Sequence, residues 1–508
     1  MNLKASIAHF LFLAVFFCFH AEIIHPQNRT AFPRVEADPK ALEYYNQESQ
    51  GYSWMQLAEI SLWASGNPAR ESSVQTTPSN IEKIGVLITN MLNSSELPSS
   101  QKERAEFILT FMHRNILRTY SIHQTRLDTI FTNGSFNCVS SGVLYIILCE
   151  AAGIKTSGVV TRQHAFVIAH IDGEYIDVET TNRYGFDPGN RKEFHDQIGR
   201  LTGFSYVPAQ NYRDRQTISK MEFISLIMNN RIADLEKTNR YAESVPIAID
   251  RASLLLGSPL AATSQNNYNE ALFSDPRKDL MDRLINYGAS LLRANREEDA
   301  IQWVLLASPL YRDPNRWYEL ISVSVNNRIS RFISAKRPLD ARTFLDSNKT
   351  FLTEDDFAKL DVIIIDADIL SRANLIQTAF DGDAVLNAIT QERANGKIEE
   401  KRANELIIFA VQKTAAALSA APDRNWRSAI QYIEFAGSLY GKQSELEQIL
   451  RTYRNNLATE YHNKFAAEWN RRNYNEAERI LNEGLAEFPD NRQLQADRDI
   501  VNRQRARQ

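Results

Sequence analysis

The pattern of apolar and polar positions divides this 508-residue chain near residue 218. Strand and helix signals alternate before that point, whereas amphipathic helical stretches follow one another after it. A nearly uninterrupted apolar stretch from Cys138 to Ala152 predicts one buried helix. Asn137 is a suitable N-cap and Gly153 a suitable C-terminal stop. We therefore expect Cys138 to lie in the first helical turn, where free backbone N–H groups favour an anion.

Two β-strands are predicted directly after this helix, over residues 164–170 and 174–179. The Asp172-Gly173 pair between them is typical of a two-residue hairpin turn. That turn pairs Ile171 with Glu174, which makes His164 and Glu179 diagonal neighbours on one face of the hairpin. Asp177 lies on the same face, one pair further from His164. The register therefore favours Glu179 as the partner of His164, with Asp177 as the alternative acid if the loop is longer or bulged.

A cysteine, a histidine and a carboxylate in this order are the groups that thiol catalysis needs. A thiolate is stabilised by a helix N-terminus and a nearby imidazole, and a carboxylate fixes the tautomer of that imidazole. Taken singly, Cys138, His164 and Glu179 each have an ordinary structural explanation, as a core residue, a hydrogen-bonded histidine and a solvated acid. The ordered set favours the catalytic interpretation. We interpret Cys149 as a core residue and His170 as a structural or rim residue.

These segments resemble the transglutaminase-like superfamily of papain-type thiol enzymes. The resemblance is carried by N-C-V-S at 137–140, H-A-F-V at 164–167 and V-E-T-T at 178–181, and it covers roughly residues 40–260. The stretch upstream of the cysteine is similar to the bacterial branch that is often joined to helical repeats. The resemblance implies Cys138 as nucleophile, His164 as base and an orienting acid at position 179. The family usually has Asp at that position, whereas this chain has Glu.

The helical stretches after residue 218 repeat loosely. A small residue recurs in them at intervals of 41 to 52 residues, which is typical of stacked helical hairpins: Ala248, Ala300, Ala341, Ala384, Ala429 and Ala477. Two units, at 284–314 and 474–489, resemble tetratricopeptide repeats. We predict a solenoid over residues 218–508, whose concave surface suits a protein or peptide partner. An irregular helical bundle with chance spacing is the alternative.

We interpret the first residues of the chain as a targeting signal. A thirteen-residue apolar run, from Ile7 to Phe19, follows a short positive start at Lys4 and is interrupted only by His9. That length suits the core of a signal peptide and is short for a membrane span. We expect residues 1–21 to be a signal peptide or, alternatively, an uncleaved anchor that tethers the chain to a membrane. Either outcome places the chain outside the cytoplasm, in the periplasm or the extracellular space.

Composition and charge indicate whether the chain can fold and which classes of partner it is expected to bind. Hydrophobic residues make up 43% of the chain, enough for a full core, and the net charge of −4 with both signs mixed argues against a nucleic-acid partner. No ligand pair has the spacing of a metal site, so we predict no metal and no other cofactor.

The predicted architecture is an α+β transglutaminase-like (papain-type) domain over residues 36–217, followed by an all-α tetratricopeptide-like solenoid. The expected activity is cleavage or transfer at a peptide or amide bond through a Cys138 acyl-enzyme. His164 would act as general base and then as general acid, and Glu179 would orient it. The competing hypothesis is a catalytically inert scaffold of the same fold, whose helical repeats bind a protein or peptide.

Overall fold

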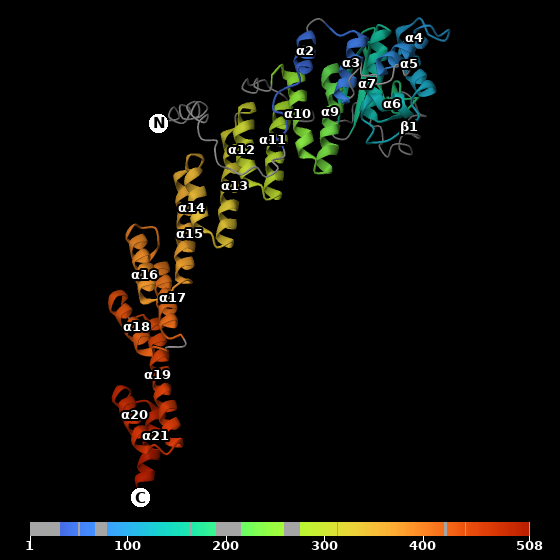
Figure 1. Cartoon of the computed structure of the whole chain (residues 1–508). Coiled ribbons are helices and arrows are strands. Elements are labelled where there is room, and N and C mark those ends of the chain that lie inside the picture. Colours follow the sequence, from blue (N-terminus) through green and yellow to red (C-terminus); the bar gives the residue numbers. More distant parts are fainter. Residues whose placement is uncertain are drawn as a thin grey trace. The chain divides into compact units, whose positions relative to one another are not determined.

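The computed structural model describes residues 31–48, 51–66, 79–161, 164–188, 215–258, 275–311, 313–420, 424–441 and 443–506. The predicted signal peptide or anchor, residues 1–21, lies outside these ranges. Contacts divide the chain into two compact units, one ending at Leu320 and the other beginning at Ile321. The described chain is mostly helical, and all of its strands belong to the first unit (Figure 1).

The first unit is built around helix α7 (Cys138–Ala151), which is buried from Val139 to Cys149. Asn137 caps this helix as predicted, because its side chain accepts hydrogen bonds from the N–H groups of Val139 and Ser140. Gly153 follows the C-cap with φ +73°, the left-handed conformation that ends many helices. Five further helices precede α7 or pack beside it: α2 (Pro39–Gln47), α3 (Trp54–Ala64), α4 (Asn80–Leu92), α5 (Gln101–Asn115) and α6 (Leu127–Asn133).

A four-stranded antiparallel sheet lies against α7, with the strand order β5-β4-β3-β6. Its strands are β3 (Lys155–Val160), β4 (Ala165–Ile171), β5 (Glu174–Val178) and β6 (Gln216–Ile218). Ile171 pairs with Glu174 and Ile168 with Asp177, so the predicted hairpin register is confirmed. Asp172 and Gly173 both have positive φ, 52° and 86°, as a two-residue turn of this kind requires.

Helix α9 (Lys220–Lys237) completes the first core. A Cβ at Gly142 of α7 would lie 2.6 Å from the Phe223 ring, and one at Gly158 of β3 would lie 2.3 Å from it, so both glycines are needed for this close approach. Helix α10 (Tyr241–Leu256) packs on α9 and α2. The predicted domain boundary after residue 217 follows the change from strand to helix signals in the sequence. In the structure, α9 and α10 contact elements of the first unit and belong to it.

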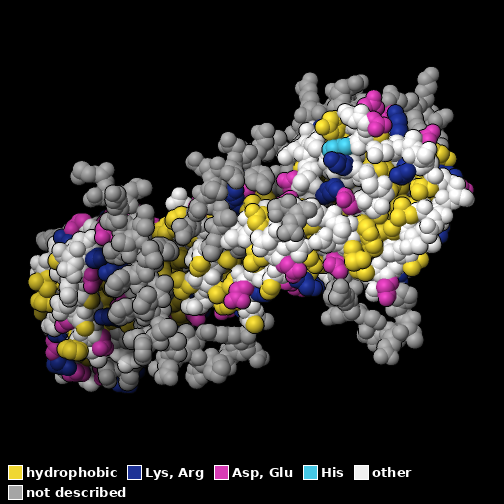
Figure 2. Space-filling model, turned by 90° about the horizontal axis from the view of Figure 1, so that it is seen from above, with side chains coloured by type: hydrophobic (Ala, Val, Ile, Leu, Met, Phe, Trp, Pro, Cys, Tyr) yellow, Lys and Arg dark blue, Asp and Glu magenta, His cyan; other side chains and the backbone are white. Residues whose placement is uncertain are grey.

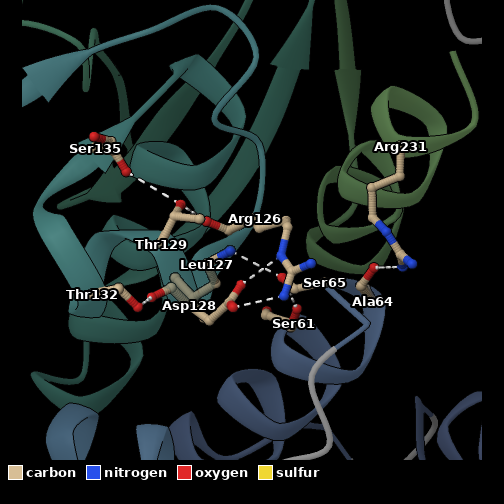
Figure 3. A network of polar contacts seen from close by, with 10 residues as sticks. All are labelled: Ser61, Ala64, Ser65, Arg126, Leu127, Asp128, Thr129, Thr132, Ser135 and Arg231. Carbon is tan, nitrogen blue, oxygen red and sulfur yellow. Dashed lines mark hydrogen bonds and ion pairs between the residues drawn. The ribbon is translucent and has the colours of Figure 1, made fainter. Parts of the chain in front are cut away.

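A polar network joins α3 and α9 to α6, the helix that leads into Cys138 (Figure 3). Ser65 Oγ accepts from the Leu127 N–H at 2.9 Å and donates to the Ser61 carbonyl at 2.7 Å. Arg231 of α9 donates to the Ala64 carbonyl at 2.5 Å. Because these groups are buried, each of these hydrogen bonds is costly to break, and together they hold the start of α6 in place.

The helical hairpins share one turn geometry. Helices α10, α12 (Glu297–Ala307), α14 (Pro338–Ser347), α18 (Trp426–Tyr440) and α20 (Tyr474–Glu487) each begin two residues after a position with positive φ. Those positions are Asn239, Asn295, Lys336, Arg424 and Arg472. The fourth residue of each helix is small and buried: Ser244, Ala300, Ala341, Ala429 and Ala477. Consecutive helices of the second unit contact one another, which is compatible with the predicted helical solenoid.

Two of the predicted small positions differ from this pattern. In α10 the fourth residue is Ser244, and the predicted Ala248 is buried one turn later. Ala384 is exposed, and Gly382 occupies the fourth position of α16 (Ala379–Ala394) instead. A Cβ at Gly382 would lie 2.3 Å from Thr414 Oγ1, so only glycine fits at this contact. Two residues correspond to about 200° around a helix, which explains why Ala384 faces away from the core. With Gly382 the spacing becomes 41 residues from Ala300 to Ala341 and again from Ala341 to Gly382.

Two hydrophobic cores follow each other along the described chain from residue 369 to residue 501 of the second unit. One gathers apolar residues from Ile369 to Leu446, and the other gathers residues from Ala458 to Val501. Helix α19 (Ser444–Asn470) contributes to both cores. The remaining long helices are α11 (Pro276–Arg293), α13 (Pro314–Ser334), α15 (Glu354–Ala373), α17 (Glu400–Leu418) and α21 (Arg492–Arg505).

The surface carries both signs of charge. On the face seen in Figure 2, acidic and basic side chains are interspersed, with exposed apolar side chains between them. Within the described ranges, no helix combines the length and the hydropathy needed to cross a membrane. The absence of a nucleic-acid partner stays a prediction.

Candidate thiol site

Cys138 is the first residue of α7, and it carries a free, partly exposed thiol. Its setting is fixed by Asn137, whose side-chain amide also donates to the Ile122 carbonyl at 3.1 Å. The Cys138 N–H has no hydrogen-bond acceptor among the residues that the structure describes. Cys149, the other described cysteine, is fully buried in the core, and burial raises its pKa to about 12. Only the first of the two thiols is therefore placed for chemistry.

His164 lies directly before β4, and its imidazole joins the thiol to an acid. Nε2 lies 2.5 Å from Glu179 Oε2, and the side chains are only 14% and 3% exposed. Cys138 interacts electrostatically with this imidazole and contributes to the raised pKa of His164. Glu179 engages Nε2, and Nδ1 of the same ring is buried. The predicted contact between Glu179 and His164 is present.

The electrostatics favour a charged pair at this position. Burial acts to lower the pKa of His164, but the carboxylate of Glu179 and the interaction with Cys138 raise it well above its ordinary value. Burial acts to raise the pKa of Glu179, but His164 and the hydrogen bonds from Thr181 outweigh burial and lower it. The imidazolium and the carboxylate therefore stabilise each other inside the protein.

The acid loop, Glu179–Gly185, holds the carboxylate in a single orientation. Oε1 of Glu179 accepts from both the N–H and the hydroxyl of Thr181, at 3.1 and 2.7 Å. The Glu179 N–H donates to the Gly185 carbonyl at 2.7 Å, which closes the loop. A Cβ at position 185 would lie 2.0 Å from the Glu179 carbonyl oxygen, so the loop requires glycine there.

Asp177, the alternative acid, is engaged elsewhere. Its two carboxylate oxygens accept from Arg215 at 2.7 and 2.5 Å. The same guanidinium lies 5.0 Å from the centre of the Phe166 ring, which holds it over the sheet. Asp177 pairs with Ile168 in the ladder, so its distance along the strand from His164 follows the expected register.

His113, Thr180 and Ser141 fasten the acid loop to two helices, and the sequence analysis missed all three. His113 of α5 lies 3.0 Å from the Thr180 carbonyl and donates to it through Nε2. The hydroxyls of Thr180 and Ser141, one turn after Cys138, lie 2.8 Å apart. Burial lowers the pKa of His113 to about 4. These contacts span 67 and 39 residues in sequence, so no local pattern indicates them.

Tyr120 was also missed. Strands β1 (Thr119–Tyr120) and β2 (Ser135–Phe136) pair in parallel, which sets Tyr120 beside Phe136, two residues before the cysteine. The two rings are 5.9 Å apart, edge to face. Burial, and then the negative charges of Cys138 and Glu179, raise the pKa of the Tyr120 hydroxyl above its usual range. The phenol therefore belongs to the surroundings of the thiol.

His170 lies apart from these residues. It is hydrogen-bonded to Ser157 of the neighbouring strand, and its ring packs edge-on against Tyr175. Its contacts fit the structural or rim role expected for it. In the part of the chain that the structure describes, no group of three His, Cys, Asp or Glu side chains could hold a metal ion. The absence of a metal or another cofactor stays a prediction.

The site combines a thiol at a helix N-terminus with a buried imidazole–carboxylate pair, and the thiol interacts electrostatically with the imidazole. Such a set of groups can supply a nucleophile, a proton carrier and an orienting group. Comparison of the sequence with protein-family models gives no match, and comparison with curated proteins gives no significant match.

Proposed function

We propose that the first unit is a transglutaminase-like cysteine enzyme that cleaves or transfers at a peptide or amide bond. The observation that supports this proposal is the buried pair of His164 and Glu179, together with the electrostatic interaction of His164 with Cys138. A helix that begins at the cysteine supports it further, because the free N–H groups of the first turn stabilise a thiolate. A buried ion pair of this kind costs desolvation energy and adds little net stability, so stability alone does not explain its presence.

The chemistry follows from the positions of the atoms. The thiolate sulfur attacks the carbonyl carbon, a C–S bond forms, and the π electrons of the carbonyl move onto its oxygen. When that intermediate collapses, the C–N bond breaks and the imidazolium of His164 gives its proton to the leaving amine. Water or an acceptor amine then attacks the thioester carbon and gives a proton to His164. The C–S bond breaks, and the Cys138 thiolate is released. Hydrolysis is the simpler outcome, because transfer needs a second site for the amine.

The second candidate function is binding through the helical repeats. The recurring turn and small residue of the hairpins support it, since stacked hairpins present an extended surface for a protein or peptide. In that case the thiol fold is an inert scaffold. The two functions are compatible in one chain if the repeats bring a protein substrate to Cys138. Export to the periplasm or the extracellular space remains part of the proposal and rests on the N-terminal apolar run alone.

Thiol labelling separates the enzyme from the scaffold without a known substrate. The rate at which iodoacetamide modifies Cys138 is measured between pH 5 and pH 9, with peptide mass spectrometry to identify the labelled cysteine. A thiolate held by His164 reacts well below about pH 8, whereas an ordinary thiol reacts only as it ionises near pH 8.5. His164→Gln should restore the ordinary profile.

Cys149 is the internal control, because a fully buried thiol in the same chain should stay unlabelled while the fold is intact. Cys138→Ala should abolish any amidase or transferase activity and leave the circular dichroism spectrum unchanged. An ordinary profile in the wild-type chain contradicts the enzyme proposal and leaves the scaffold.

A further inference from the structure

The segment that carries Tyr120 pairs with the residues that lead into the candidate nucleophile. Tyr120 is held by the parallel pairing of β1 with β2, and the next residue, Ser121, donates its N–H to the Phe136 carbonyl at 2.8 Å. The Asn137 side chain continues this contact by donating to Ile122. The segment that carries Tyr120 therefore runs beside the three residues that lead into the thiol.

The phenol is positioned by its ring and not by its oxygen. The ring packs edge to face on Phe136, at 5.9 Å between centroids and 82° between planes. Among the residues that the structure describes, none is hydrogen-bonded to the Tyr120 hydroxyl. The side chain is only partly exposed, yet it senses the charges of Cys138 and Glu179. A half-buried hydroxyl that stays protonated and has no partner is free to donate to a bound molecule.

The backbone supplies a second donor at the same place. The Cys138 N–H lies at the start of α7 and has no acceptor within the described ranges. The Asn137 side chain accepts instead from the N–H groups of Val139 and Ser140. Two donors beside a nucleophilic sulfur are what a developing oxyanion needs, since catalysis gains most from donors that are already in place.

We propose that the Tyr120 hydroxyl and the Cys138 N–H together bind the oxyanion that forms when the thiolate attacks a carbonyl group. The inference rests on the proposed function, because it gives Tyr120 a role in the same acyl transfer. The sulfur forms a bond to the carbonyl carbon, and the carbonyl electron pair moves to the oxygen between the two donors. Neither donor loses its proton. When the pair returns, the bond to the leaving group breaks and a thioester remains on Cys138.

p-Nitrophenyl acetate tests this role, because its acylation of a thiol passes through a tetrahedral oxyanion. Alkylation by iodoacetamide displaces iodide at a saturated carbon and forms no oxyanion, so it reports the reactivity of the thiolate alone. The two rates are measured on the full-length chain at one pH, as the burst of p-nitrophenolate and as the labelling of Cys138. Tyr120→Phe keeps the ring on Phe136 and removes only the hydroxyl.

The expected result is an acylation rate lowered by roughly 10²-fold in Tyr120→Phe, with the rate of alkylation within about twofold of wild type. Tyr175→Phe is the matched control, because this exposed tyrosine packs on His170 at the hairpin and should change neither rate. Equal acylation in Tyr120→Phe and wild type would overturn the inference and leave the proposed function standing.

Two further outcomes are also decisive. A parallel fall of both rates in Tyr120→Phe would show that the substitution disturbs the thiolate itself, and the oxyanion role would then be wrong. A wild-type chain that gives neither a burst nor alkylation of Cys138 below pH 8 would remove the proposed function and this inference with it.

Discussion

His113 makes the first unit sensitive to acid, and the size of the effect follows from its burial. The ordinary pKa of a histidine is near 6.5, and burial lowers that of His113 to about 4. Between these two values the unfolded chain binds a proton that the folded chain does not bind. The free energy of unfolding therefore falls as the pH is lowered from about 6.5, and the loss levels off below pH 4.

The magnitude comes from the difference in pKa. A difference of about 2.5 units corresponds to about 3 kcal/mol at most, and about 2 kcal/mol of it is lost by pH 5. His113→Gln keeps an N–H donor for the Thr180 carbonyl but cannot titrate. Other groups titrate in both proteins, so the difference between wild type and His113→Gln isolates the contribution of this histidine.

Cys149 provides the assay, because its complete burial in α7 makes its labelling a report on the first unit alone. In a Cys18→Ser, Cys138→Ser background, urea unfolding is followed at pH 7 and pH 5 by the reaction of Cys149 with 4,4′-dithiodipyridine. Between these pH values, the chain with His113 should lose about 2 kcal/mol more than the His113→Gln chain. Equal losses in the two chains would refute the argument and show that His113 is protonated in the folded state.

Three other results are expected. Glu179→Gln should reduce acylation of Cys138 by about 10⁴-fold, whereas Asp177→Asn, which weakens the contact with Arg215, should reduce it little; the reverse order would contradict the observed register. Gly185→Ala should lower the free energy of unfolding of the first unit by roughly 2 kcal/mol or more, because the alanine Cβ would collide with the Glu179 carbonyl oxygen. Gly85→Ala is the control, because its Cβ would lie 3.7 Å from the Trp54 ring, an ordinary van der Waals distance. This substitution should leave the free energy of unfolding unchanged or raise it in the same urea assay. Cell fractionation should recover the chain outside the cytoplasm, and recovery of the unprocessed chain in the cytosol would contradict export.

Local signals were enough to predict the hairpin and the start of α7. Asp172 and Gly173 tolerate positive φ, so the turn length and the register follow from two adjacent residues. Asn137 caps the helix by accepting hydrogen bonds from Val139 and Ser140, which follow it closely in the sequence. The position of Cys138 in the first turn can therefore also be predicted from local sequence. The contact of His164 with Glu179 then follows from strand geometry, because the two residues flank one short hairpin.

The other site residues depend on contacts that no local pattern carries. Tyr120 reaches the site through a parallel pair of two-residue strands, too short to show any periodicity. His113 lies on a helix whose last turn gives no sign that it contacts Thr180. The recurrence of alanine in the other hairpins predicts Ala384, whereas the contact with Thr414 leaves no room for a Cβ and therefore requires Gly382.

Helix α19 determines how the second unit responds to tension. Its first half ends one hydrophobic core through Leu446, and its second half begins the next core through Ala458 and Phe465. A force that pulls on the C-terminus therefore acts first on α20 and α21. It reaches the earlier core through α19 and through the ion pair between Arg427 of α18 and Glu487 of α20. Because the helices are joined in series, the C-terminal core should rupture as a separate step while the earlier helices stay folded.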